Sequence, residues 1–132
     1  MAKVKLAKQL LVAAENKVGM LAEVSAAVSG AGVNIQGINA YAVDNKAYFR
    51  LLTDNNAKVK EVLQGKGYEV KEQEAVLVEL PNQVGVLKAA ADKLKSAGID
   101  LSYIYGTTCS CGGDCLLVFG ANNNAQAQKA LS

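Results

Sequence analysis

Short apolar runs and helical stripes alternate along the chain, and each kind occurs twice. Residues 10–14 and 75–80 are short apolar runs, partly β-branched, and Asn or Pro follows each within two residues, so both predict buried strands. A stripe of apolar residues at spacings of three and four comes after each run and predicts a helix. The stripes consist of Leu21, Val24, Val28 and Ala31, and of Leu87, Ala90, Leu94 and Ala97. Gly32 and Gly98 come next and can adopt the left-handed conformation that ends a helix.

Paired strand-like runs follow each of these helices. In the first half they cover residues 34–43 and 46–53, and the Asp44-Asn45 dipeptide between them favours a tight hairpin. In the second half the matching runs cover residues 101–108 and 115–120. We therefore expect a hairpin after each helix.

A second helix and a final strand complete the first half. The helix is predicted over about residues 55–64, with Val59, Val62 and Leu63 on one face, and the strand over residues 68–71. The resulting order is βαββαβ. Right-handed crossovers then place both helices on one face of a four-stranded antiparallel sheet, which is the ferredoxin-like arrangement of the α+β class.

The two halves are repeats of one another. When the sequence is aligned with itself at an offset of 66, the identities between positions 10 and 38 are 9 of 29. Farther along the offset becomes 68, where Asn55-Asn56-Ala57 meets Asn123-Asn124-Ala125. The two extra residues fall between two predicted strands, near residues 109–114. We expect one module over residues 1–72 and a second over residues 73–132.

The second repeat stops before its final strand. Ser132 corresponds to Gln64 (132 − 68 = 64), so nothing matches residues 68–71. The apolar strand over residues 75–80 would then be an unpaired sheet edge, which native proteins normally cover. Three segments are candidates for that cover: residues 3–6, an extended strand from the first repeat, or a second chain.

The turn between the first strand and the first helix of each repeat carries the candidate chemistry. These glycine corners comprise residues 16–19 and 82–85, each with the pattern Asn-x-Val-Gly. Unpaired N–H groups at a helix start favour an anion, and glycine lets a ligand approach the main chain closely. The asparagine side chain both donates and accepts, so one corner could bind the carboxylate and the ammonium of a zwitterion. The alternative is that Asn16 and Asn82 only cap their helices.

These corners carry a family resemblance. With its Asn-x-x-Gly-x-Leu corner and its Gly-Val-Asn-Ile or Gly-Ile-Asp-Leu strand start, each repeat resembles an ACT domain, and the chain resembles stand-alone tandem ACT proteins. The resemblance implies that two modules pair side by side through their second strands. It also implies that an amino acid binds between the corner of one module and the second strand of the other. The implied ligand-binding residues are Asn16, Val18, Gly19, Met20, Leu21, Asn34, Ile35, Asn82, Val84, Gly85, Val86, Leu87, Asp100 and Leu101.

The two implied sites differ in charge. If the repeats pair within one chain, Asn16 faces Asp100 and Asn82 faces Asn34, so only the first site has a carboxylate for a ligand ammonium. We expect that site to bind more tightly. For a ligand of about ten heavy atoms, we expect roughly −5 to −8 kcal/mol, or roughly micromolar affinity and weaker.

One departure from the family bears on the ligand. Some members that bind serine have a histidine two residues before the corner asparagine, where this chain has Ala14 and Leu80. A more apolar ligand is therefore favoured.

Composition narrows the function further. Fourteen basic and twelve acidic residues give a net charge of +2, which provides no field for a nucleic acid or a membrane surface. The chain has no histidine, the commonest catalytic base, and its single arginine, Arg50, lies in a predicted strand rather than in a phosphate-binding loop. We expect no enzyme activity and no cofactor. Three cysteines, an odd number, and the lack of an export signal or an apolar stretch of about 18 residues indicate a cytoplasmic protein.

A cysteine cluster supports a second interpretation. Cys109, Cys111 and Cys115, with Asp114, could complete a tetrahedral thiolate metal site, although the spacing matches no standard zinc motif. The protein would then be a metal-binding or structural interaction protein. Five strand aromatics could also suggest RNA stacking, but the recognition signature is missing and packing explains them better. They are Tyr48, Phe49, Tyr103, Tyr105 and Phe119.

The sequence as a whole predicts a small-molecule-binding regulatory protein. We expect an amino acid to be held between paired modules, in a homodimer that acts in trans, as an allosteric regulator of a metabolic enzyme or other partner. The sequence does not identify the ligand or the partner.

Overall fold

The computed structural model describes residues 3–107 and 113–132, and these form alternating strands and helices. The elements are β1 (Lys3–Glu15), α1 (Met20–Gly30), β2 (Ile35–Val43), β3 (Lys46–Thr53), α2 (Asn56–Gly65), β4 (Glu69–Leu80), α3 (Val86–Ser96), β5 (Leu101–Thr107), β6 (Cys115–Ala121) and α4 (Asn124–Leu131). Among the described residues the hydrogen-bonded strands follow the order β2-β3-β1-β4-β6-β5. The chain divides into two compact units, each of which contains one repeat.

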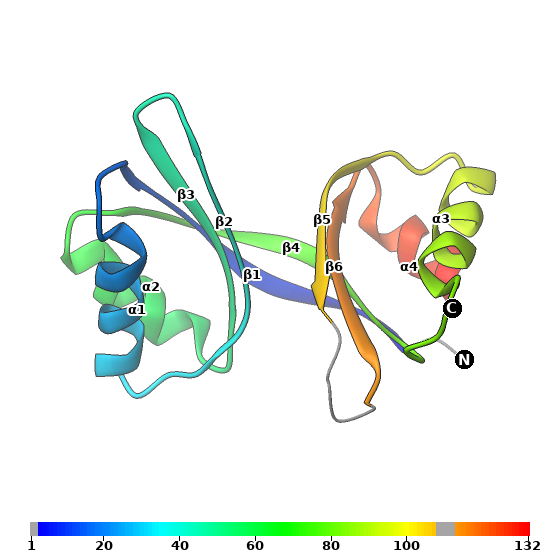
Figure 1. Ribbon diagram of the computed structural model, residues 1–132, viewed down its shortest axis with the longest axis horizontal. Helices are drawn as coiled ribbons and strands as arrows, with labels where there is room; N and C mark the ends of the chain where they lie inside the picture. Colours follow the sequence, from blue (N-terminus) through cyan, green and yellow to red (C-terminus); the bar gives the residue numbers. More distant parts are fainter. Residues whose placement is uncertain (1–2, 108–112) are drawn as a thin grey trace. The chain divides into compact units, whose positions relative to one another are not determined.

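The first repeat unit, Lys8–Gln73, has the ferredoxin-like arrangement that the sequence predicts. Its strand order is β2-β3-β1-β4, and β3 is antiparallel to both of its neighbours. Helices α1 and α2 cover the same face of these strands (Figure 1). Between the helices and the strands lies a buried core that includes Leu10, Val12, Val24, Phe49, Val59 and Leu63.

The second repeat unit, residues 3–7 with Glu74–Ser132, has the same arrangement in its own strands. The order is β5-β6-β4-β1, with β6 antiparallel to both β4 and β5. Helices α3 and α4 cover one face (Figure 1). The core here includes Val76, Val78, Leu94, Phe119, Ala127 and Leu131. Whether residues 1–72 and 73–132 are separate domains stays a prediction.

The missing final strand of the second repeat is provided by the start of the chain. In the strand order β1 is the neighbour of β4, and residues 3–7 belong to the unit that contains β6. Val4 and Leu6 pack against the core of this unit, and Gln128 Nε2 donates to the carbonyl of Val4 at 3.5 Å. The apolar strand over residues 75–80 is therefore covered, and the first of the three expected segments is confirmed.

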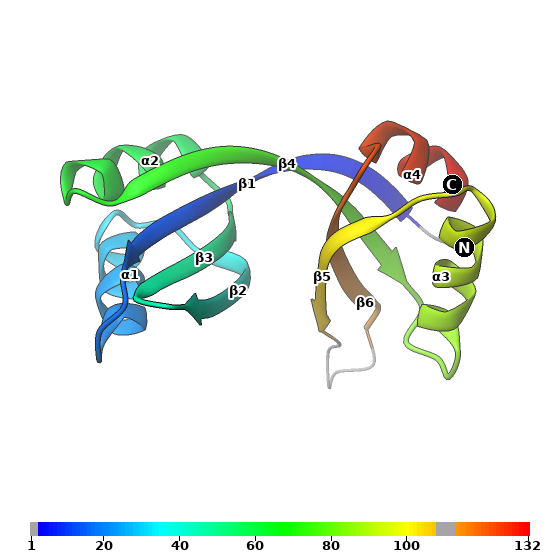
Figure 2. The same cartoon turned by 90° about the horizontal axis from the view of Figure 1, so that it is seen from above.

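Strands β1 and β4 are longer than the sequence pattern predicts. The separate strands expected over residues 68–71 and 75–80 are one continuous strand, and β1 already includes Lys3 rather than starting near residue 10 (Figure 2). The polar residues Glu72, Gln73 and Glu74 interrupt the apolar pattern without a glycine or proline to end the strand. Strand β1 passes from one unit to the other after residue 7, and β4 does so after residue 73. These two positions are separated by the repeat offset (73 − 7 = 66), so β1 and β4 are divided between the units at matching positions.

Turns and caps repeat as well. Gly32 and Gly98, after α1 and α3, have φ of 74° and 70°, as the predicted helix ends require. Asn55 and Asn123 cap the N-termini of helices α2 and α4, and their side chains accept from backbone N–H groups at 3.2 and 3.0 Å. No described helix is both long and apolar enough to span a bilayer.

Candidate functional site

The glycine corners start α1 and α3 without a side-chain cap. Gly19 and Gly85 are the N-cap residues, with φ of 91° and 86°, and no side chain accepts a capping hydrogen bond at either helix. Because residues with a Cβ are strained at this φ, glycine is favoured at both positions. The interpretation that Asn16 and Asn82 cap these helices is therefore wrong.

Backbone N–H groups remain available at each corner. In the first, Met20 N–H donates to Lys17 O at 3.3 Å and Glu23 N–H to Gly19 O at 2.9 Å. The N–H groups of Leu21 and Ala22 have no hydrogen-bond partner within the described part of the chain. They lie at the positive end of the helix dipole, where an anion is favoured.

A hollow of about 310 Å³ lies at the first corner, within the first repeat unit. Four of the predicted ligand-binding residues line it: Asn16, Gly19, Met20 and Leu21. Strands β2 and β3 contribute its other wall, with Ala40, Tyr41, Ala42, Ala47 and Phe49. Asn16 N–H donates to Asn45 O at 2.8 Å and so ties the corner to the hairpin turn. The corner is therefore a fixed, partly apolar hollow with available amide donors.

The predicted strand-start residues do not reach the corner of their own repeat. Ile35 begins β2, whereas the hollow uses Ala40 and the residues after it, about 16 Å farther along the strand. Asn34 N–H donates to Asp54 Oδ1 at 3.1 Å, and Asp100 N–H donates to Asn122 Oδ1 at 3.3 Å. The predicted pairing of each corner with the strand start of another module stays a prediction, as do Asn34, Ile35, Asp100 and Leu101 as ligand contacts.

Apolar side chains at the corners are exposed to the same extent in both repeats. Val18 and Val84 are fully exposed, and Leu21 and Leu87 are each 55% exposed. Val18 does not line the hollow beside it. Matched exposure of apolar groups at one place in two repeats favours a contact role over chance.

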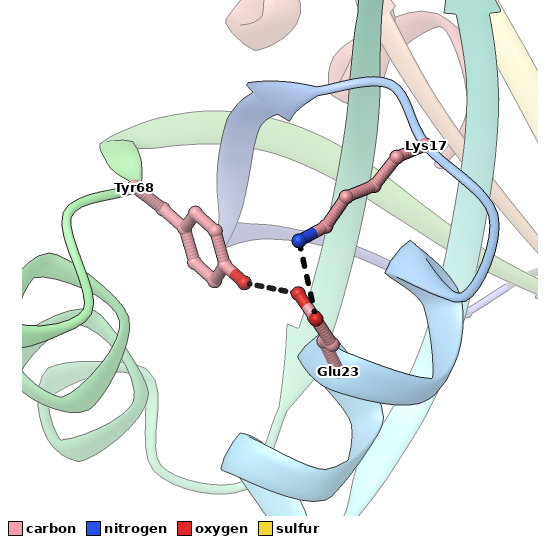
Figure 3. A network of polar contacts seen from close by, with 3 residues as sticks. All are labelled: Lys17, Glu23 and Tyr68. Atoms are coloured by element: carbon pink, nitrogen blue, oxygen red, sulfur yellow. Dashed lines mark hydrogen bonds and ion pairs between the residues drawn. The ribbon is translucent and has the colours of Figure 1, made fainter.

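A polar network that the sequence did not reveal braces the first corner (Figure 3). Glu23 Oε2 accepts from the Tyr68 hydroxyl at 3.0 Å, and its Oε1 lies 3.4 Å from Lys17 Nζ. The hydrogen bond from Tyr68, followed by the contact with Lys17, lowers the pKa of Glu23. Desolvation, followed by the hydrogen bond to Glu23, raises the pKa of Tyr68. No spacing rule joins Glu23 with a residue as distant in sequence as Tyr68.

The second corner lacks this network. At the repeat offset of 66, Gln83 stands where the first repeat has Lys17, and Ala89 stands where it has Glu23. Gln83 N–H instead donates to Pro81 O at 2.9 Å. The two corners share their backbone conformation but differ in what stabilises them.

The cysteine cluster lies largely outside the described residues. Cys109 and Cys111 are in residues 108–112, whereas Cys115 is a free, half-buried thiol in β6 that packs against the core. Within residues 3–107 and 113–132, no group of three metal-ligating side chains comes together. The metal-site hypothesis stays a prediction.

The strand aromatics have packing roles. Phe49 and Phe119 are core residues of their units. Tyr48 stacks on Tyr41 with 5.4 Å between ring centroids, and Tyr103 stacks on Tyr105 at 6.4 Å. The preference for packing over RNA stacking agrees with these contacts.

Comparisons with known proteins agree with the repeat architecture. A protein of Bacteroides thetaiotaomicron has a similar solved structure, with a TM-score of 0.89 and 22% identity over 97% of this chain and 88% of that one. The ligand-free regulatory subunit of aspartate kinase from Thermus thermophilus has a TM-score of 0.67 and 17% identity, over 97% of this chain and 93% of that one. The corresponding subunit from Thermus flavus has a TM-score of 0.64 and 16% identity, over 98% and 94%. No curated protein matches the chain. The family model described as ACT domain pair matches residues 5–131, and the chain therefore belongs to the family of ACT domain pairs.

Proposed function

We propose that this protein binds an amino acid, or a similar small acid, at its glycine corners and signals that occupancy to a partner in trans. One observation carries the proposal: α1 begins with a left-handed glycine and no side-chain cap, beside a hollow of about 310 Å³. Such a helix start has available donors, and the hollow has the size of a small metabolite site. Membership of the ACT domain pair family and the regulatory subunits among its structural neighbours support this role.

The residues of the first corner suggest how a ligand would be held. Its carboxylate would accept from the N–H groups of Leu21 and Ala22, and Gly19 leaves space for it to approach the main chain. The Asn16 side chain would accept from the ammonium group. Tyr41 and Phe49 provide an apolar wall for the ligand side chain.

A second module would complete the site. The ligand ammonium needs more than one acceptor, and we propose that Asp100 provides a carboxylate to the Asn16 corner, whereas the Asn82 corner meets the amide of Asn34. Asp100 and Asn34 are both exposed. The second module comes from the same chain or from a second copy in a homodimer. The Asn16 site is expected to bind more tightly, and changing Asp100 to Asn should remove that difference.

Regulation follows from differential binding. A ligand that touches two modules favours whichever packing of those modules gives it more contacts, and it shifts the population by no more than that difference in affinity. Because the role lies in binding and signalling rather than catalysis, we propose that the protein has no enzyme activity and acts on a metabolic enzyme or another partner in the cytoplasm.

A thermal-shift screen against the twenty amino acids tests the proposal. The ligand should raise the unfolding temperature in proportion to the logarithm of its concentration, because it binds the folded state only. Asn16→Ala and the matched Asn82→Ala should each weaken the effect of that ligand, whereas Asn45→Ala, in the hairpin turn, should not. If no amino acid raises the unfolding temperature at about ten millimolar, roughly fifty times the weakest dissociation constant expected, the proposal is wrong.

A further inference from the structure

A second hollow, of about 240 Å³, lies in the second repeat unit on the helical side of the sheet. Its lining comes from β4, α3 and α4 and is almost wholly apolar, with Val78, Leu80, Ala90 and Leu131 among its residues. Pro81 and Val86 also line it, and Val86 is one of the ligand-binding residues predicted for the second corner, whereas Asn82, Val84, Gly85 and Leu87 do not line it. The hollow therefore shares Val86 with the second corner, and its other lining residues lie outside the predicted corner site.

The repeat explains why this hollow is apolar. In the first repeat unit Tyr68 packs against the core, and its hydroxyl reaches Glu23 on α1 (Figure 3). At the repeat offset the sequence match of Tyr68 is Ala2 (68 − 66 = 2), which lies outside the described residues. Glu23 is matched by Ala89, which lines the hollow. The glutamate of the polar pair is thus replaced by a small apolar residue.

The matching place in the first unit is a hollow of different character. Glu23 and Ala27 line it, and they match Ala89 and Lys93 of the second unit. Tyr68 and Lys66 complete its wall, whereas Val12 and Leu63, which match Val78 and Leu131, do not contribute to it. The second unit therefore has an apolar floor at the place where a tyrosine and a glutamate line the first.

One positive charge stands at this apolar hollow. Lys93 is the only charged residue among the described residues that line it, and the matching residue in the first unit is the buried Ala27. Within residues 3–107 and 113–132, Lys93 has no carboxylate partner, whereas Lys88 on the same helix pairs with Asp92 at 2.7 Å. An occupant with an apolar body and a negative group would fit both features.

We infer that this hollow binds a small carboxylic acid with an aromatic or branched apolar body. The body packs on the apolar lining formed by Val78, Leu80, Ala90 and Leu131, and the carboxylate pairs with Lys93. A volume of 240 Å³ corresponds to about eight waters, which suits a single ring with a short acid chain. Most of the affinity comes from the apolar contacts, since an exposed lysine pair contributes little. This site does not depend on the proposed corner function.

Titration of the full chain with 4-hydroxyphenylacetate, followed by methyl NMR, tests the inference. The expected result is saturable shifts of the methyl groups of Val78, Ala89, Ala90 and Leu131, with the methyl groups of Leu21 and Leu87 unchanged. Ala89→Phe fills the hollow and should weaken binding at least tenfold. Ala91→Phe, on the same helix but outside the hollow, is the matched control and should bind as the wild type does.

The charge is tested separately. Lys93→Gln should weaken the binding of 4-hydroxyphenylacetate about two- to fivefold. The affinity for the neutral 4-methylphenol should not change. Shifts confined to the glycine corners, or an equal loss in Ala89→Phe and Ala91→Phe, would overturn the site. Binding that ignores Lys93→Gln would overturn the assignment to carboxylic acids. A failed amino acid screen together with these shifts would instead leave the hollow standing without the corner function.

Discussion

The two repeat units share a fold and a corner geometry but differ in what lies behind the corner. In the first, Tyr68 covers the core beside α1 and joins Glu23 and Lys17 in a polar network. In the second, Gln83 and Ala89 take the positions of Lys17 and Glu23, and the hollow beside them is apolar. The backbone conformation of the helix start is thus common to both units, whereas the side-chain contacts around it differ.

This comparison separates the features that both glycine corners share from the features that occur in one repeat. A left-handed glycine without a side-chain cap recurs in both units, so it belongs to the shared role. The brace of Lys17, Glu23 and Tyr68 occurs in the first unit only. We therefore expect the two corners to have the same kind of ligand but different stiffness.

The greatest loss of stability is expected where the second unit depends on the start of the chain. Leu6→Asp places a carboxylate against the core, in the strand segment that covers the β4 edge. Burial of an unpaired charge should destabilise the second unit by about 3 kcal/mol, measured by urea unfolding. Lys5→Asp, at an exposed position of the same strand, should change stability by less than about 0.5 kcal/mol. Equal losses in both variants would show that residues 3–7 do not belong to that core.

A smaller loss is expected from removing the side chain that distinguishes the two units. Tyr68→Ala should destabilise the first unit by about 2 kcal/mol through lost packing of the ring. With Glu23→Ala added, it should also leave an apolar hollow like that of the second unit. Binding of 4-methylphenol to a second site, with methyl shifts at Val24 and Leu63, measures this directly. If the double variant gains no such site, Tyr68 and Glu23 do not account for the difference between the units.

The corner glycines should respond alike in both units. Gly19→Ala and Gly85→Ala each force a Cβ into a left-handed conformation, at a cost of about 1 kcal/mol. No atom lies within 4 Å of the position that a Cβ would take at either glycine, so no steric clash adds to the backbone strain. Urea unfolding of the two variants measures the cost. Losses that differ by more than about 0.5 kcal/mol, the usual scatter between independent sites, would show that the corners are not equivalent.

The smallest effect is expected for the pH dependence of the stability that the network of Lys17, Glu23 and Tyr68 contributes. The pKa of Glu23 is lower in the folded state, so its contribution is fully present above the ordinary value of 4.5 and is lost as the pH falls through the folded pKa. The pKa of Tyr68 is raised from 10.0, so its contribution is present below pH 10 and is lost as the pH rises further. Wild type and Glu23→Gln should therefore differ most in stability above pH 4.5, and the difference should shrink as the pH falls below that value. A difference that stays unchanged down to the lowest pH at which the chain is folded would contradict the network.

The sequence predicted the elements well because their signals are local. The apolar stripe of α1, the Asp44-Asn45 turn and the glycines at positions 32 and 98 all depend on near neighbours. The repeat itself also exposed the missing final strand. From that gap alone, residues 3–6 could be identified as one of three candidate covers.

Other features depend on contacts between distant residues and could not be read from the sequence. The continuity of β4 through Glu72, Gln73 and Glu74 depends on strand pairing, which overrides the polar interruption. The contact of Tyr68 with Glu23 joins positions 45 residues apart. The repeat offset aligned Asn56 with Asn124, but it did not predict the matching hydrogen bonds that they make. Asn56 donates to the carbonyl of Lys8, and Asn124 donates to the carbonyl of Glu74.

Amide NMR of the ¹⁵N-labelled full chain, titrated with the amino acid that most raises its unfolding temperature, decides whether the glycine corners hold the ligand. The N–H signals of Leu21 and Ala22, and of the matching Leu87 and Lys88, should move most, because these donors would meet the ligand carboxylate. Saturation should occur near micromolar concentrations or above. If the largest shifts fall elsewhere, or these four signals stay fixed at saturation, the glycine corners are not the ligand site.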